Sequence, residues 1–423
     1  MVLWSSILII TLSLWMVLKS RHNLLMFVLT VIIFYFNYSA IYACYLNPIE
    51  GNMYTQQITH KSYVISLNIL ASFTALIFLM VRWSRMIELF DTNIFIDKAK
   101  SNKYIIYTLC IILTLIFFAG FTIPELGERG SGSPLYEYSI LLFVLMFYYS
   151  GGNKRYIRLA CILIGFFSLQ GFIFGGRVEG IQLLLCAYLM AFIDKIKKRT
   201  LFILMVFAFV LLSVIGVARG NLLTGDFEFE SVITGLIKAG GASDTAYSAY
   251  YASEAIVYML DKMTSQQWFS LTVGYIQSIF IGSNLNLELS PVSADYVPHT
   301  GGGWLPFYFY FYFRGIGVFM SALYVSFFMN IIAKLDNKSS SFLKLVSVLF
   351  VSRVFRWYLY SPSPLLRGMI IFSVVYALFA YYNYYLKKIG LVKKTGTEGY
   401  GEGTEGYPQA GCEDPDKPAE VYR

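Results

Sequence analysis

The sequence of 423 residues is short of charge. Asp, Glu, Lys and Arg together make up 14% of the residues, whereas about a quarter of a typical water-soluble domain is charged. Histidine and cysteine are also scarce, with three and five residues. The low charge excludes most soluble folds, and the small number of His and Cys argues against a metal cluster or a disulfide framework.

Long apolar runs occupy most of the chain, and 57% of its residues are hydrophobic. A helix that crosses the bilayer needs about 20 largely apolar residues. The runs therefore predict an all-α, polytopic integral membrane protein with about eleven transmembrane helices, within a range of about ten to twelve. They lie near residues 2–18, 24–46, 63–81, 104–123, 135–149, 157–174, 178–193, 200–217, 305–332, 341–360 and 366–386.

The distribution of Lys and Arg predicts how these helices are oriented, because basic residues accumulate in cytoplasmic loops. The alternate set of loops that begins at Lys19 and Arg21 holds 21 of the 33 basic residues, and the opposite set holds seven. With eleven helices, this bias puts the N-terminus outside and the C-terminus inside. The net charge of +8 is then a signature of topology, and no basic, aromatic-rich surface indicates a nucleic-acid partner.

The predicted transmembrane domain covers residues 1–394, and the segment 395–423 has a different composition. This segment is rich in Gly, Glu and Pro and nearly repeats TEGYGEG as TEGYPQAG. It has too little apolar surface to fold, so we expect a disordered cytoplasmic tail. Cys412 in this tail is expected to be a free thiol. The other cysteines, which lie in apolar runs, are expected to be small packing residues.

One loop, residues 219–303, is much longer than the others and lies on the predicted outer face. Its segments 229–238, 245–260 and 268–281 have apolar residues at helical spacing and are interpreted as short amphipathic helices on the membrane surface. From residue 220 onward the loop carries eight acids and two bases. It is either a structural cap over the bundle or the region in which function is concentrated.

Six arginines lie at or near the outer ends of the spans, where the topological rule does not expect them: Arg177, Arg219, Arg314, Arg353, Arg356 and Arg367. An ionisable residue at membrane depth is a functional hypothesis by default, and the guanidinium fork matches phosphate oxygens. We therefore predict that they bind an outer-leaflet lipid phosphate or diphosphate. The first three, which adjoin glycines, are the leading candidates. The alternative is that the arginines only reach headgroups or pair with Glu179.

The segment 297–317, VPHTGGGWLPFYFYFYFRGIG, is the most distinctive in the chain. His299, the only histidine in the long loop, and Asp295 are candidate catalytic bases, although any of the loop acids can compete with them. The alternative for His299 is an ordinary polar surface residue. The aromatic run Phe307–Phe313 is interpreted as a lipid-facing belt, with a platform for sugar stacking as the alternative.

In architecture and in a few short motifs, the chain resembles the bacterial repeat-unit polymerases of the Wzy type, which make O-antigen and capsular polysaccharide. The architectural resemblance covers most of residues 1–390. The motifs are GGRVEG at 175–180, VARG at 216–219, and HTGGGWLP followed by FRGIG between 299 and 317. The paired Arg-x10-Gly motif of some members is absent, because Tyr188 and Glu230 stand where it requires glycine.

The resemblance implies a helical bundle like that of type C glycosyltransferases in the bacterial plasma membrane, with an active site that faces the periplasm. The implied activity transfers a growing chain from undecaprenyl diphosphate to the next lipid-linked oligosaccharide unit. Arginines would stabilise the leaving diphosphate in place of a metal ion, no cofactor would be needed, and His299 or Asp295 would deprotonate the acceptor. The implied partners are these lipid-linked oligosaccharides, membrane lipids and, as candidates, a chain-length regulator and a flippase.

Two other functions are compatible with the same sequence features. An O-antigen ligase would share the fold, the long outer loop and the Arg/His pair, so sequence separates it poorly from a polymerase. A transporter of lipid-linked oligosaccharides would need polar residues through the whole depth of the bundle and inverted repeats. No convincing internal repeat is present, and the arginines gather at one face, which favours a surface site over a conduit.

Overall fold

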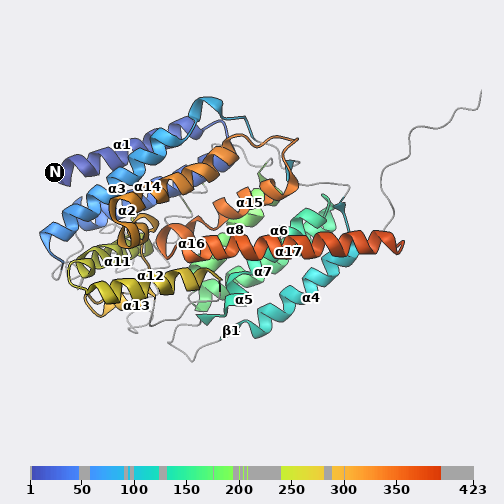
Figure 1. Ribbon diagram of the computed structural model, residues 1–423. Helices are drawn as coiled ribbons and strands as arrows, with labels where there is room; N and C mark the ends of the chain where they lie inside the picture. The colour runs from blue at the N-terminus through green and yellow to red at the C-terminus, as the bar shows by residue number, and fades with distance from the viewer. Residues whose placement is uncertain are drawn as a thin grey trace, which may run out of the picture.

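The computed structural model describes residues 2–46, 58–89, 94–95, 100–122, 131–174, 176–193, 200, 203, 207, 240–280, 288–299 and 301–391. Most of these residues are helical, and most of the long helices run side by side (Figure 1). Helices α11, α12 and α13 lie at one end of the bundle, and the last turns of α17 lie at the other. The predicted tail, residues 395–423, lies outside the described residues.

The elements of the first half, in chain order, are α1 (Val2–Ser20), α2 (Leu24–Ile41) with the π-helix η1 (Tyr42–Leu46), α3 (His60–Met80), the 3-10 turn η2 (Trp83–Arg85), α4 (Lys103–Ala119), β1 (Phe121–Thr122), β2 (Ser131–Gly132), α5 (Pro134–Glu137), α6 (Ser139–Tyr149), α7 (Lys154–Phe174) and α8 (Arg177–Ala187) with the π-helix η5 (Tyr188–Phe192). The two short strands pair antiparallel, with Phe121 opposite Gly132.

The elements of the second half are α11 (Asp244–Leu260), α12 (Ser265–Phe280), α13 (Leu289–Ala294), α14 (Leu305–Ala333), α15 (Ser341–Ser352), α16 (Val354–Leu359) and α17 (Ser363–Lys388). Many helices begin at a Ser, Thr or Asn whose side chain accepts a hydrogen bond from a backbone N–H of the first turn. Such caps are Asn23, Thr59, Asn102, Ser133, Ser243 and Ser340.

Within the part of the chain that the structure describes, six helices are long and apolar enough to cross a membrane: α1, α2 with η1, α3, α7, α14 and α17. The prediction of a helical membrane protein is confirmed at this level. Ten of the eleven predicted spans coincide with helices in the structure, some of them shorter or in two pieces, and the span at 200–217 lies almost wholly outside the described residues. The number eleven and the type C architecture stay predictions.

Buried polar side chains fix which of these apolar helices are neighbours. Asn37 of α2 donates to Ser13 Oγ of α1 at 2.7 Å and accepts from the Tyr358 hydroxyl of α16 at 2.9 Å. Asn102, at the start of α4, donates to Asn383 of α17 at 2.7 Å. An unpaired amide in apolar surroundings is costly, so helices that satisfy one another in this way are held in one arrangement.

Helix α11 forms where the sequence predicts an amphipathic helix, but its predicted place on the membrane surface is wrong. Most of its side chains are buried, and it packs against α2, α3 and α14. Alanines at 246, 249, 252 and 255 are among the buried residues, so backbones can approach closely along this side. Helix α12 does expose an apolar stripe, whereas the predicted helix at 229–238 lies outside the described residues.

Helix α14 is broken at Arg314, whose φ of 54° and ψ of −138° are not helical. A non-glycine residue in this region is strained. The break interrupts the regular pattern of backbone bonds, and the Trp268 indole of α12 donates to the Phe311 carbonyl at 3.0 Å. The N-terminal part of α14, residues 305–313, is thereby attached to α12.

Candidate functional site

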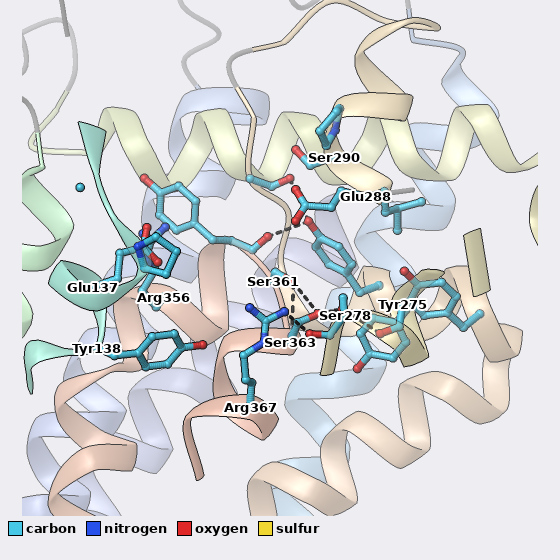
Figure 2. Close-up of a pocket in the computed structure, with 18 residues that line it drawn as sticks. Glu137, Tyr138, Tyr275, Ser278, Glu288, Ser290, Arg356, Ser361, Ser363 and Arg367 are labelled. Atoms are coloured by element: carbon cyan, nitrogen blue, oxygen red, sulfur yellow. Dashed lines mark hydrogen bonds and ion pairs between the residues drawn. The ribbon is translucent and has the colours of Figure 1, made fainter. Parts of the chain in front are cut away.

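A cavity of about 380 Å³ opens among α5, α12, α13, α14, α16 and α17 (Figure 2). This volume falls within the range of about 300–1,000 Å³ usual for small-molecule sites. The polar groups that line it are two arginines, two glutamates, five tyrosines and four serines: Arg356, Arg367, Glu137, Glu288, Tyr138, Tyr275, Tyr308, Tyr312, Tyr360, Ser278, Ser290, Ser361 and Ser363. Two of the six predicted arginines thus meet in one cavity.

Arg356 of α16 is held by two carboxylates. Its guanidinium forms an ion pair with Glu137 of α5 and a second one, at 2.7 Å, with Glu179 of α8. The side chain is 18% exposed, and its guanidinium also lies 5.2 Å from the centre of the Tyr360 ring. The predicted alternative that an outer arginine pairs with Glu179 is therefore confirmed for Arg356.

Arg367, in the first turns of α17, differs because no carboxylate pairs with it among the described residues. One of its Nη atoms donates to the Ser278 carbonyl of α12, while its Nε is buried without a hydrogen-bond partner in the part of the chain that the structure describes. The Ser278 and Ser363 hydroxyls bond each other at 2.9 Å beneath it. Arg367 thus lines the cavity with a guanidinium charge that no described carboxylate neutralises, as a site for an anionic ligand requires.

Arg353 is 4% exposed and lies behind the same wall. Its guanidinium is 4.9 Å from the centre of the Tyr138 ring, and it fills the space in which a side chain at Gly368 would stand. Its Nε has no hydrogen-bond partner among the described residues. Arg353 therefore places its positive charge beside Gly368, the residue that follows Arg367, without lining the cavity itself.

Glu288 lies across the cavity from the arginines, with Ser290 beside it (Figure 2). It occupies the N-cap position of α13, but its side chain makes no capping hydrogen bond. Within the described ranges, neither an ion pair nor a hydrogen bond occupies its carboxylate. The cavity thus has fixed cations on one side and an uncommitted anion on the other.

The aromatic run 307–313 supplies part of the cavity wall, and its interpretation as a lipid-facing belt is wrong. Phe307, Tyr308, Phe311 and Tyr312 are each at most 4% exposed, and Phe313 alone in the run is exposed. Tyr312 stacks on Tyr275 of α12, with ring centres 4.4 Å apart and planes 19° apart. Because the run begins a helix that is covered by α11 and α12, its tyrosines face protein and cavity.

The glycines at 301–303 explain how α14 reaches this position. All three have positive φ, at 97°, 91° and 150°, which suits residues without Cβ. A side chain at Gly302 would meet the Leu359 carbonyl, and Gly303 N–H donates to that same carbonyl at 2.9 Å. The glycines therefore let the loop lie directly on the end of α16, next to the cavity.

The two predicted bases, His299 and Asp295, do not line the cavity. His299 Nδ1 accepts from Gly301 N–H at 3.0 Å, and its Nε2 lies 2.8 Å from Ser293 Oγ, which itself donates to the Ser290 carbonyl. These bonds assign a neutral ring with the proton on Nε2, and burial lowers the pKa of His299 below its ordinary value. Asp295 is an exposed residue at the end of α13.

The three arginines ranked first from sequence are not the ones that meet in the cavity. Arg177 pairs with Asp244 at 3.0 Å beside a void of about 20 Å³, room for roughly one water. Arg314 is exposed at the break in α14, and among the described residues it has neither a hydrogen bond nor an ion pair. Arg219 lies outside the described residues.

Sequence reasoning missed Glu137 and did not single out Glu288. Glu137 stands at the start of an apolar run, so the rule that draws attention to ionisable residues at membrane depth applies to it as well as to the arginines. Glu288 was one of eight loop acids, and nothing in its immediate sequence distinguishes it. No feature of the sequence pointed to three of the serines that line the cavity, Ser278, Ser361 and Ser363.

No protein-family model, no curated protein and no solved structure matches this chain. Among the described residues, no group of three or more His, Cys, Asp or Glu side chains is placed to hold a metal ion.

Proposed function

We propose that the protein is a membrane glycosyltransferase that polymerises oligosaccharide repeat units carried on undecaprenyl diphosphate, on the outer face of a bacterial plasma membrane. The observation that carries the proposal is Arg367. Arg367 lines a cavity large enough for a ligand and pairs with no carboxylate among the described residues, and guanidinium groups bind phosphate oxygens through directed N–H bonds.

The surroundings of Arg367 support a lipid-linked diphosphate as the ligand. Helix α17 begins at Ser363 and continues into a long apolar segment with exposed side chains at Ile370, Val374 and Leu378. Arg367 stands on the same helical side as these residues, because they follow it by three, seven and eleven positions. A phosphate at Arg367 could therefore be joined to a chain that lies along α17 in the bilayer.

The other wall of the cavity supports a sugar as the second part of the ligand. Tyr275, Tyr308 and Tyr312 offer aromatic surface and hydroxyls, and Ser290 and Ser361 add further hydroxyls. Aromatic surface with a few convergent polar groups is the usual lining of a site that orients a small ligand. Transfer would develop negative charge on the departing diphosphate, which preplaced arginines stabilise.

Arg356 has a different part in this proposal, since two carboxylates already hold its charge. It keeps α5, α8 and α16 together around the cavity and presents its remaining N–H groups in a fixed orientation. Arg353, packed behind the wall, raises the local positive potential. Arg367 is the arginine whose removal should cost the most activity for the smallest change in the fold.

The test uses purified protein in vesicles with an undecaprenyl-diphosphate-linked oligosaccharide. Wild-type protein should produce lipid-linked chains of two or more units with release of undecaprenyl diphosphate, detected by mass spectrometry. Arg367→Ala should lower the rate about 100-fold or more, in line with the loss of a charge-stabilising donor, and Arg367→Lys should recover only part of it. Arg85→Ala, a change at an exposed arginine of η2, is the matched control.

The same assay separates the competing functions. A ligase would leave the units unjoined until a different lipid acceptor is added. A transporter would move the labelled units across the vesicle membrane and never join them. Either result, obtained with folded wild-type protein, would overturn the proposed polymerase.

A further inference from the structure

Glu288 is the one carboxylate on the described lining of the cavity that no cation neutralises. Glu137, the other lining acid, is committed to Arg356, and Glu179 behind it is committed to the same arginine. Neither an ion pair nor a hydrogen bond is formed by the Glu288 side chain within the described ranges, although its carbonyl accepts from Val292 N–H at 3.3 Å. Its backbone is therefore fixed by the first turn of α13 while its carboxylate stays available.

The position of the Glu288 carboxylate relative to the arginines matters as much as its lack of a partner among the described residues. In Figure 2, Glu288 and Ser290 lie on one side of the cavity, and Arg356 and Arg367 lie on the other. A ligand with an anionic end at Arg367 would place the rest of its structure toward Glu288. A carboxylate is unsuited to bind that anion but is well suited to accept a proton from a hydroxyl group.

We infer that Glu288 is the general base that activates the acceptor sugar, an inference that rests on the proposed function. Its carboxylate takes the proton of an acceptor hydroxyl, and the hydroxyl oxygen forms a bond to the anomeric carbon of the donor. The bond between that carbon and the diphosphate oxygen breaks, and its electron pair leaves on the diphosphate at Arg367. The proton on Glu288 then passes to water. One displacement of this kind inverts the configuration at the anomeric carbon.

The two bases expected from sequence are less well placed for this step. Both ring nitrogens of His299 are engaged, with Gly301 N–H and with Ser293 Oγ, and these bonds hold the loop that carries the glycines 301–303. Asp295 is exposed and does not line the cavity. Glu288, by contrast, is on the cavity wall and needs no rearrangement of bonds to accept a proton.

The experiment compares Glu288→Ala, Glu288→Gln and Glu288→Asp with wild-type protein in the vesicle assay, and Glu88→Gln at an exposed site serves as the matched control. Loss of a general base should lower kcat about 10²–10⁴-fold, with little change in KM for the lipid-linked donor. The isosteric Gln variant tests the role if the Ala variant fails to fold. Added formate or azide should restore activity to Glu288→Ala, a rescue that a merely structural role would not give.

The outcomes separate this inference from the function on which it rests. If wild-type protein joins units and both Glu288→Ala and Glu288→Gln do so within about threefold of its rate, Glu288 is not the base and the polymerase proposal stands. Loss of kcat confined to His299 or Asp295 variants would also overturn the inference. If folded wild-type protein joins no units from any donor, the proposed function fails and the assignment of Glu288 fails with it.

Discussion

Arg356 and Glu254 are largely buried ionisable residues, and the protein accommodates them in opposite ways. Arg356, at the cavity, is paired with two carboxylates. Glu254, on α11, is 5% exposed and accepts a 2.5 Å hydrogen bond from the Tyr45 hydroxyl of η1, which also lies 3.0 Å from the Tyr250 hydroxyl. No Lys, Arg or His pairs with it among the described residues.

The difference shows where this molecule retains charge. Burial raises the pKa of Glu254 to about 8, although the Tyr45 hydrogen bond opposes the shift. Near neutral pH Glu254 is therefore mostly a neutral carboxylic acid that joins α11 to η1. Arg356 keeps its charge because Glu137 and Glu179, which form ion pairs with it, supply the opposite charges. The contact of Glu254 with η1 is thus neutral, although ion pairs lie at both ends of α11. The cavity wall keeps its charges, as the proposed anionic ligand requires.

Removing Arg356 should have the largest effect on stability, because it deprives both Glu137 and Glu179 of their ion-pair partner. Breaking a buried ion pair from one side costs about 3–5 kcal/mol, and partial exposure of the two acids brings the expectation for Arg356→Met to about 3 kcal/mol. Thermal unfolding in detergent measures it. Adding Glu137→Gln and Glu179→Gln should recover most of the loss.

The matched comparison for Arg356→Met is Arg177→Met. The partner of Arg177 is Asp244, whose side chain is 43% exposed, so water can solvate it and the loss should be below about 1 kcal/mol. Equal losses in the two variants would mean that the pairing with two carboxylates gives Arg356 no special part in the fold.

Glu254→Gln should have the next largest effect, and one that depends on pH. A carboxyl whose folded-state pKa lies above its unfolded value of about 4.5 destabilises the fold as it ionises, so wild-type stability should decrease from about pH 4.5 upward until about pH 8. Between pH 6 and pH 9 the decrease should be about 2–3 kcal/mol. The Gln variant should lack this decrease.

The control for this pH dependence is Asp261→Asn, at an exposed residue that follows α11 and pairs with Lys61. Its unfolding should keep the wild-type pH profile. A Glu254→Gln protein whose stability decreases with pH as steeply as the wild type would show that Glu254 does not ionise in this range.

Tyr45→Phe should have a smaller effect, of about 1 kcal/mol, since it removes one buried hydrogen bond. Because the Tyr45 hydroxyl lowers the folded-state pKa of Glu254, its loss should also extend the pH-dependent decrease to higher pH. Unfolding profiles of the variant between pH 6 and pH 10 measure both quantities. A shift toward lower pH would contradict the assignment of Tyr45 as the donor.

Arg314→Gly should give the smallest effect, and a favourable one. Its positive φ in the middle of α14 is strained for arginine and accessible to glycine. We expect a gain of up to about 1 kcal/mol in thermal unfolding. Arg85→Gly, at an exposed site outside the long helices, should show no gain. A loss of stability at Arg314 would indicate that its side chain contributes more than the strain costs.

Sequence alone predicted the positions of most helices, because the length and apolar content of a span depend on the residues within it. Sequence predicted less about what each helix packs against in the folded protein. The helix at 245–260 and the aromatic run at 307–313 both have surface-like patterns, yet both are buried, since other helices cover them. Periodicity records which side of a helix is apolar but not whether protein or lipid lies against that side.

The membrane character of the chain and the presence of unusual arginines were determined by sequence, through composition and position alone. Only the tertiary structure decided which arginines meet, and which acid each one meets. Arg356 and Glu137 are 219 positions apart in the chain, and Glu288, just before α13, lies across the cavity from Arg367 of α17. Such pairings depend on how helices pack, and ion pairs and cavities form between helices, where no local pattern in the sequence records them.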